Sequence, residues 1–198
     1  MDDTAGRRPA VPPDATAEAP GALGVIEAFV NTTSIDDPQQ SERFRTPTDL
    51  TAWLRRYGLL LEREEVGTDD EVARAVRLRE ALRELLYANH DGVEPPLAAL
   101  EIVDEEARRV PVTLRFSTDG AELAPAGDGL DAALAALLVI VLDAMHDGTW
   151  RRLKACQSST CRWAMWDASR NRSGKWCDMA VCGNRIKVRN YRERHAEG

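Results

Sequence analysis

All four cysteines of this 198-residue chain lie between residues 156 and 182, and none precedes them. They form two pairs of spacing C-x4-C, Cys156 with Cys161 and Cys177 with Cys182. Two short-spaced pairs joined by a loop can place four thiolates at the corners of a tetrahedron, the geometry that Zn²⁺ adopts in closed structural sites. The alternatives are two disulfides, which a reducing compartment disfavours, or four unrelated buried thiols, which would not cluster in pairs. The pattern therefore predicts one zinc site.

The predicted zinc ion has a structural role. Four thiolates complete its coordination shell and leave no position for a catalytic water. A segment of about 40 residues also has too little core to fold by apolar burial alone. We therefore expect one Zn²⁺ per chain to supply much of the folding free energy of this end, and removal of the metal to unfold it.

The net charge of −7 is divided unevenly along the chain. Residues 150–198 carry 12 Lys and Arg against 4 Asp and Glu, whereas residues 1–149 carry 14 against 29. A basic end on an acidic body favours contact with nucleic acid through that end. A solvated basic tail would have the same composition and is the alternative.

The basic end also shows local structure. The alternation over residues 163–166 predicts a short strand, residues 169–174 form a polar turn, and the run from Gly183 onward lacks proline and can be helical. Such a helix places three arginines at i, i+4 and i+7 on one face, where they can contact phosphates. The candidate nucleic-acid-binding residues are Arg170, Arg172, Lys175, Asn184, Arg185, Lys187, Arg189 and Arg192.

The cysteine-rich segment resembles a known family. It reads Trp176-Cys177-Asp178-Met179-Ala180-Val181-Cys182-Gly183-Asn184-Arg185, preceded by Cys156-x4-Cys161 and by Trp166-Asp167-Ala168-Ser169-Arg170-Asn171. This is similar to the CGNR zinc finger of bacterial proteins described as stress-induced transcription regulators. Two departures are Gly174-Lys175, where the family has a pair of arginines, and Glu27, where it has an aspartate.

In that family the finger follows an N-terminal domain called ABATE. The present chain is similar there too, with Phe29-Val30-Asn31-Thr32, Leu50-Thr51-Ala52-Trp53-Leu54 and Leu78-Arg79-Glu80-Ala81-Leu82. The resemblance implies nucleic-acid binding through the finger and transcriptional regulation. DNA is the favoured partner, and RNA is the alternative.

The rest of the chain predicts a mainly α-helical body with one small β-hairpin. Apolar periodicity and capping residues predict helices over residues 22–30, 46–57, 68–89, 95–108 and 128–146, and a hairpin over residues 110–124. The apolar run of the last helix predicts burial on nearly all sides. We expect a disordered leader over residues 1–20, a body over residues 21–149, and a zinc finger of short strands and a helix over residues 150–198, packed on the body because the join is short.

The body carries a candidate effector site at Asn31, Thr32 and Arg79. A polar pair that ends an apolar helix, and an arginine on an apolar helical stripe, both need buried partners. The alternative is mutual satisfaction within the protein, with Arg79 capping the carbonyls at the end of the first helix.

Other classes find little support in the sequence. The chain has no nucleophilic-triad order, phosphate loop or paired-histidine metal motif, so we do not expect an enzyme. It has no apolar run of about 20 residues and no secretory signal, which favours a cytoplasmic, nucleoid-associated protein without a membrane partner.

Two function classes follow. The first is a DNA-binding regulator whose body senses a small-molecule effector and forms a homodimer that spaces two fingers on DNA. The second is an RNA-binding or protein-interaction module in which zinc is purely structural, with a thiol redox response as a further version.

Overall fold

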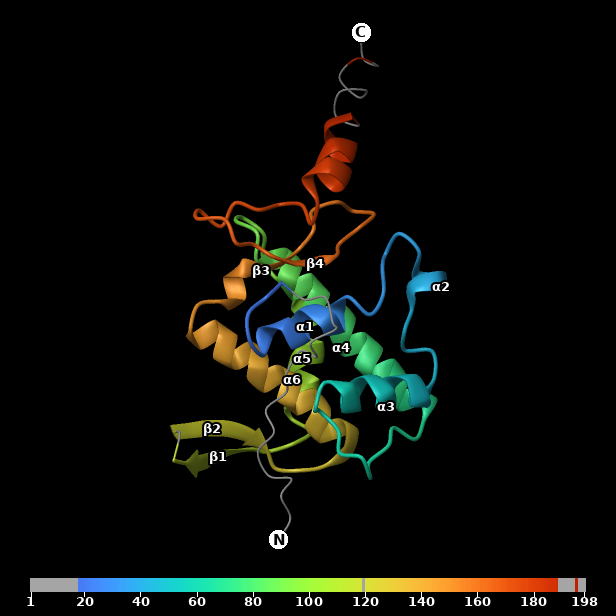
Figure 1. Cartoon of the computed structure of the whole chain (residues 1–198), viewed down its shortest axis with the longest axis vertical. Coiled ribbons are helices and arrows are strands. Elements are labelled where there is room, and N and C mark those ends of the chain that lie inside the picture. The colour runs from blue at the N-terminus through green and yellow to red at the C-terminus, as the bar shows by residue number, and fades with distance from the viewer. Residues whose placement is uncertain (1–17, 119, 189–194, 196–198) are drawn as a thin grey trace.

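A computed structural model describes residues 18–118, 120–188 and 195 of the chain. In Figure 1 a body of helices and one hairpin lies below the cysteine-rich segment, from which a helix leads away from the body. The helices of the body are α1 (Leu23–Val30), α2 (Pro38–Ser41), α3 (Pro47–Arg56), α4 (Asp69–Ala88), α5 (Leu97–Ala107) and α6 (Gly129–His146). The strands are β1 (Val112–Ser117), β2 (Gly120–Pro125), β3 (Leu153–Ala155) and β4 (Ala164–Trp166). This mainly helical fold with a four-cysteine module is the predicted class.

Local polar residues form capping boxes at the start of two helices of the body, α3 and α4. At α3 the Asp49 N–H donates to the Thr46 hydroxyl at 3.2 Å, and the Thr46 N–H donates to the Asp49 carboxylate at 2.9 Å. Thr68 and Glu71 form the same reciprocal pair at α4. Each capping box satisfies backbone donors that the first helical turn leaves without partners. Both helices begin where the sequence predicts.

The hydrophobic core lies where α4 and α6 pack with α1, α3 and α5. The leucines of α4 that face it, Leu78, Leu82 and Leu86, are fully buried. Phe29 of α1 and Trp53 of α3 add an aromatic contact, with ring centroids 5.4 Å apart. The four-residue spacing of Leu78, Leu82 and Leu86 explains why α4 turns one face toward the core.

The last helix of the body, α6, is buried on one face only. The sequence predicted burial on nearly all sides, and that prediction was wrong. Leu134 and Leu137 are fully buried, whereas Leu142 is 37% and Met145 is 47% exposed. An apolar run does not encode how many neighbours cover it, so the extent of burial was overestimated. By length and composition α6 could cross a membrane, but its buried face belongs to the core of the body.

Two boundaries also need correction. The segment between the first two predicted helices, over which no helix was predicted, contains the short helix α2. Glu18 and Ala19 fall in the predicted disordered leader, yet their N–H groups donate to the Glu27 carboxylate at 2.8 and 2.7 Å, and Ala19 is buried. Burial raises the pKa of Glu27. The remainder of the predicted leader, residues 1–17, lies outside the described residues.

The predicted hairpin forms from β1 and β2, which pair antiparallel from Val112 opposite Pro125 to Ser117 opposite Gly120. The β2 strand packs against α6, while β1 faces solvent with Phe116 81% exposed. The hairpin therefore extends the body at the end opposite the cysteines (Figure 1).

The cysteine-rich segment packs directly on the body. After α6 the chain turns at Gly148, with φ at +78°, and a short 3-10 turn leads into β3. The antiparallel pair of β3 and β4 lies with β3 against α4 and β4 against α1. Leu153 and Ala164 belong to the same apolar core as the body helices. One core therefore spans the join, and the expected packing is present.

Candidate metal centre and nucleic-acid interface

The four cysteine sulfurs converge on one point. All four Sγ atoms lie within 4.8 Å of one another, with Cys161 and Cys177 3.5 Å apart and Cys177 and Cys182 3.7 Å apart. Four sulfurs at about 2.3 Å from a central Zn²⁺ would be separated by about 3.8 Å in a regular tetrahedron. A disulfide needs about 2.05 Å, and all four cysteines are free thiols. The donor set and its spacing fit one Zn²⁺ ion.

The pairing of β3 with β4 positions the first two cysteines. Cys156 follows β3 and its N–H donates to the Trp163 carbonyl at 2.9 Å, and the Cys161 N–H donates to the Ser158 carbonyl at 3.0 Å. Arg162 has φ at +51°, a left-handed conformation that returns the chain toward β4. The strand predicted from the alternation around Trp163 is β4. A tight turn between two strands thus presents both thiols on one side.

Asp178 organises the second pair of cysteines. Its carboxylate accepts the N–H groups of Ala180 and Val181 at 2.6 and 3.0 Å, and its carbonyl accepts the Cys182 N–H at 2.9 Å. These bonds wind residues 179–183 into a π-helical turn, which brings Cys182 back toward Cys177. Residues 184–188 continue as a helix, as predicted from Gly183 onward.

Cys156, Cys161 and Cys177 lie so close together that each thiol affects the pKa of the others. A hydrogen bond from Cys161 lowers the pKa of Cys156 to about 5, and the same bond raises the pKa of Cys161 far above its ordinary value. Burial raises the pKa of Cys177 to about 12. Because neighbouring thiols stabilise one thiolate at the expense of the others, a cation is needed to ionise the whole set, and its binding releases protons.

A buried ion pair holds the loop between the two cysteine pairs. The Lys154 ammonium lies 2.8 Å from the Asp167 carboxylate, and the two side chains are 3% and 2% exposed. Asp167 also accepts the N–H groups of Ser169 and Gly174 at 3.0 and 2.8 Å. Burial raises the pKa of Asp167, but these donors outweigh it and lower the pKa to about 2.

Gly174, one departure from the family pattern, lies in close contact with Asp167. A Cβ atom at Gly174 would lie 2.8 Å from Cγ of Asp167, closer than non-bonded carbon atoms approach. In this arrangement of the loop, a larger residue at position 174 would therefore displace the Asp167 carboxylate, which accepts the Gly174 N–H. Neither member of the Lys154–Asp167 pair was singled out from the sequence, where a lysine and an aspartate 13 residues apart carry no recognisable signal.

The predicted nucleic-acid-binding residues within the described part of the chain lie at the surface. Those that are exposed are Arg170, Arg172, Lys175, Asn184, Arg185 and Lys187. The Arg185 guanidinium is engaged with Asp36 of the body at 3.3 Å and with the Thr160 hydroxyl at 3.2 Å. Arg189 and Arg192 lie outside the described residues. The exposed set therefore divides between the loop before Cys177 and the helix after Cys182.

The end of α4 binds the first half of the finger. The Asn89 amide donates to the carbonyls of Trp150 and Leu153 at 2.8 and 2.7 Å. The His90 ring Nε2 lies 2.8 Å from the Ala155 carbonyl, which accepts this hydrogen bond, and burial lowers the pKa of His90. Apart from the polar residues that end the helix, no pattern in the sequence indicates these contacts.

Arg83 of α4 joins the finger to α1. It is 1% exposed, and its guanidinium donates to the Val30 carbonyl at 2.6 Å and to the Arg162 carbonyl at 3.0 Å. The Arg162 guanidinium in turn pairs with Glu84 at 2.8 Å. The cap predicted for the end of the first helix is therefore supplied by Arg83, one turn after Arg79.

The three candidate effector residues are occupied by protein partners. The Asn31 amide pairs with both backbone groups of Ala164 in β4, at 2.8 and 2.9 Å. The Arg79 guanidinium donates to the Thr32 hydroxyl at 3.2 Å and to both oxygens of the Glu42 carboxylate at 2.8 Å. These contacts match the alternative of mutual satisfaction, and effector binding at these residues stays a prediction.

Fold and site together define a helical body that carries a C-terminal four-cysteine zinc finger. The ABATE family model, described as "Putative stress-induced transcription regulator", matches residues 23–147, and the CGNR zinc finger model matches residues 152–195. The chain belongs to the ABATE family and carries a CGNR zinc finger, whose four cysteines form one structural zinc site. Neither description is that of an enzyme. No curated protein sequence matches the chain.

Proposed function

We propose that this protein is a transcription regulator that binds DNA through its zinc finger. The observation that carries the proposal is the surface of the finger, where a zinc-organised loop and helix expose Arg170, Lys175 and Lys187. Phosphate contacts from such side chains supply most of the affinity for nucleic acid. The body, with its excess of Asp and Glu, repels the same phosphates, so the finger is the part that approaches them.

Arg185 fits this role although it already has a partner. Its ion pair with Asp36 joins side chains that are 51% and 41% exposed. Exposed pairs contribute little free energy, because water and salt screen them. Arg185 can therefore exchange the Asp36 carboxylate for a phosphate at small cost. The neighbouring Asn184 has the amide group needed to recognise a base edge.

The proposal includes homodimerisation and cytoplasmic localisation at the nucleoid. One small finger makes few specific contacts, so two fingers spaced by a dimer would improve discrimination between sites. Sedimentation velocity on the zinc-loaded chain, alone and with duplex DNA, tests the dimer. A single monomeric species in both samples would remove that part of the proposal and leave the finger as the sole determinant of binding.

Fluorescence anisotropy with labelled nucleic acid tests the function. We compare duplex DNA from upstream of the gene with single-stranded RNA, using zinc-loaded full-length protein at about 50 to 200 mM salt. Replacement of Arg170 or Lys187 by Ala should weaken DNA binding at every sequence and make the slope of log K against log salt shallower by about 0.9 per contact. Arg63→Ala, at an exposed position of the body, is the matched control.

Three outcomes separate the alternatives. DNA binding by the finger is supported if the finger variants lose affinity for every DNA sequence while Arg63→Ala keeps the wild-type affinity. Asn184→Ala should relax preference at one base pair, at a cost of about 1 to 3 kcal/mol, if that side chain reads a base. If the protein binds the RNA more tightly than the DNA, RNA is the partner. If the finger variants retain zinc and bind nucleic acid as tightly as wild type, a protein partner is favoured.

A further inference from the structure

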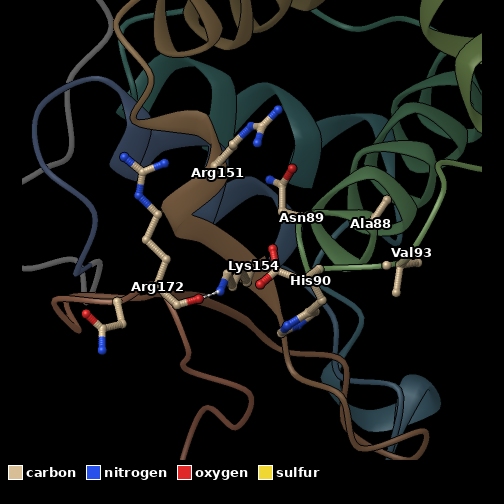
Figure 2. A pocket seen from close by; sticks show the side chains of 10 residues that line it. Ala88, Asn89, His90, Val93, Arg151, Lys154 and Arg172 are labelled. Carbon is tan, nitrogen blue, oxygen red and sulfur yellow. Dashed lines mark hydrogen bonds between the residues drawn. The ribbon is translucent and has the colours of Figure 1, made fainter.

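A polar pocket of about 370 Å³ lies where the body meets the finger (Figure 2). Its walls come from the end of α4, the turn before β3, β3 itself and the loop between the cysteine pairs. The residues that line it are Ala88, Asn89, His90, Asp91, Gly92, Val93, Arg151, Lys154, Asn171 and Arg172. A volume of this size is within the range of small-molecule sites, about 300 to 1,000 Å³.

Two arginines supply positive charge to the pocket. Arg151 and Arg172 are both exposed, and neither guanidinium forms a hydrogen bond or ion pair with another residue in the described part of the chain. Figure 2 shows both side chains on the same side of Lys154. A guanidinium carries five N–H donors in a planar fork that matches the oxygens of phosphate or carboxylate. The pair is therefore suited to one oxyanion.

Lys154 has a different task at this site. Its ammonium is bound to the Asp167 carboxylate at 2.8 Å and to the Arg172 carbonyl at 2.5 Å. The three donors of a lysine are thus largely used by the protein. These bonds fix the backbone at Arg172, where φ is +52°, and so set the direction from which its side chain leaves the loop. Lys154 positions Arg172 rather than binding a ligand itself.

The part of the pocket wall that follows α4 carries the opposite charge. Asp91 places an exposed carboxylate just after the C-terminal end of α4, where the helix dipole is negative. The Asp91 carboxylate does not attract a simple anion, whereas it attracts an ammonium group or another cationic donor. The two walls together favour a compact molecule with an oxyanion at one end and an ammonium group at the other.

We propose that this pocket binds a small zwitterionic phosphate compound, with its phosphate on Arg151 and Arg172 and its ammonium group toward Asp91. Ligand binding here does not require DNA binding by the finger, although Arg172 belongs both to the pocket and to the candidate nucleic-acid-binding residues. Because its walls belong to α4 on one side and to the loop of the finger on the other, an occupant contacts both parts at once. Ligand binding would therefore stabilise the docked arrangement of finger and body.

Calorimetric titration and thermal unfolding of the zinc-loaded full chain test the proposal, with phosphoethanolamine, ethyl phosphate and inorganic phosphate as probes. Phosphoethanolamine should bind more tightly than ethyl phosphate, and a hundredfold excess over Kd should raise the unfolding temperature by about 5 to 10 °C. Arg151→Gln and Arg172→Gln should each weaken binding about tenfold or more. Arg170→Gln, in the same loop but outside the pocket, is the matched control.

Asp91→Asn isolates the second wall. It should abolish the preference for phosphoethanolamine over ethyl phosphate and leave inorganic phosphate binding unchanged. Circular dichroism and zinc content show that each variant is folded. If none of the three probes binds at millimolar concentration, or if Arg170→Gln loses as much as Arg172→Gln, the pocket is not a ligand site. If Arg151→Gln impairs only DNA binding, the two arginines contact the nucleic-acid backbone instead, and the proposal fails.

Discussion

Replacement of Arg83 by Met tests whether the body and the finger form one cooperative unit. Methionine keeps the apolar stem of the side chain but removes the guanidinium, which bonds the Val30 carbonyl at 2.6 Å, the Arg162 carbonyl at 3.0 Å and the Glu80 carboxylate at 2.9 Å. Among the residues that the structure describes, Arg83 has the largest volume of those whose side chains are fully buried. Its guanidinium also lies 3.4 Å from the Thr33 carbonyl, so the substitution leaves three backbone carbonyls without their charged donor in the interior.

The expected cost follows from those contacts. A hydrogen bond to a charged group contributes about 1.5 to 3 kcal/mol, and breaking a buried charged contact costs about 3 to 5 kcal/mol. Glu80 retains Arg79 at 2.8 Å, so its carboxylate is not left unpaired. We expect Arg83→Met to lower the free energy of unfolding by about 3 to 5 kcal/mol and the unfolding temperature by about 6 to 20 °C.

Urea unfolding followed by tryptophan fluorescence measures this change on zinc-loaded protein. Arg77→Met is the matched control, because Arg77 lies on the same helix, is exposed, and its side chain has no hydrogen bond to another described residue. It should change stability by less than about 0.5 kcal/mol. Amide exchange at Ala164 supplies a second readout, since loss of the Arg162 contact should loosen β4. A loss below about 1 kcal/mol in Arg83→Met would refute the reasoning that this residue joins the two parts.

The remaining predictions concern titration and packing. Burial raises the pKa of Glu80, but the hydrogen bonds and charges of Arg83 and Arg79 outweigh burial and lower this pKa. The ionised Glu80 carboxylate therefore stabilises the fold above its unfolded pKa of about 4.3. This stabilisation disappears as the pH falls through the lower pKa of the folded state. The stability difference between wild type and Glu80→Gln, measured from pH 6 down to about pH 3, should shrink over that interval, and a constant difference would contradict the assignment. Gly174→Ala should destabilise the protein by about 1 to 3 kcal/mol through its clash with Asp167, whereas Gly67→Ala, whose Cβ would meet its nearest neighbour at 3.6 Å, should be tolerated. Equal thermal stability of these two variants would show that the loop adjusts freely.

Local signals account for the parts of the structure that the sequence predicts well. Thr46 and Thr68 are cap residues whose partners lie three positions away, so the information for each helix start is contained in one turn. The cysteine spacing is similar, because the metal dictates which side chains have to meet. Neither inference requires knowledge of how distant segments pack.

The errors arise where tertiary packing decides. Arg79 and Arg83 lie one turn apart on the same stripe of α4, and only the position of α1 and the finger determines which of them reaches the Val30 carbonyl. The pocket is a stronger example, since Asp91, Arg151 and Arg172 come from three segments that no spacing rule connects. Burial of α6 was overestimated for the same reason, because its apolar run does not specify its neighbours.

Removal of zinc should affect the two halves of the finger differently. The first half is held by the body, since Asn89, His90 and Asn31 bond β3 and β4 without involving the metal. Residues 176–184, in contrast, form no hydrogen bond to a described residue of the body, and the helix that follows is attached through the exposed Arg185–Asp36 pair. The second half therefore depends on the Zn–S bonds for its position.

Amide exchange with and without a strong chelator distinguishes this order from complete unfolding of the finger. The Ala164 N–H should remain protected after zinc removal, because its acceptor is the Asn31 side chain, whereas the Cys182 N–H should lose its protection as the π-helical turn opens. Asn31→Ala removes this acceptor, so in that variant the Ala164 N–H should exchange faster even with zinc bound. Equal loss of protection at both sites in the wild-type protein would mean that the metal, rather than the body, organises the whole finger. Since the exposed cations lie on both sides of Cys177, the result also decides whether the metal-free protein keeps part of its phosphate-binding surface.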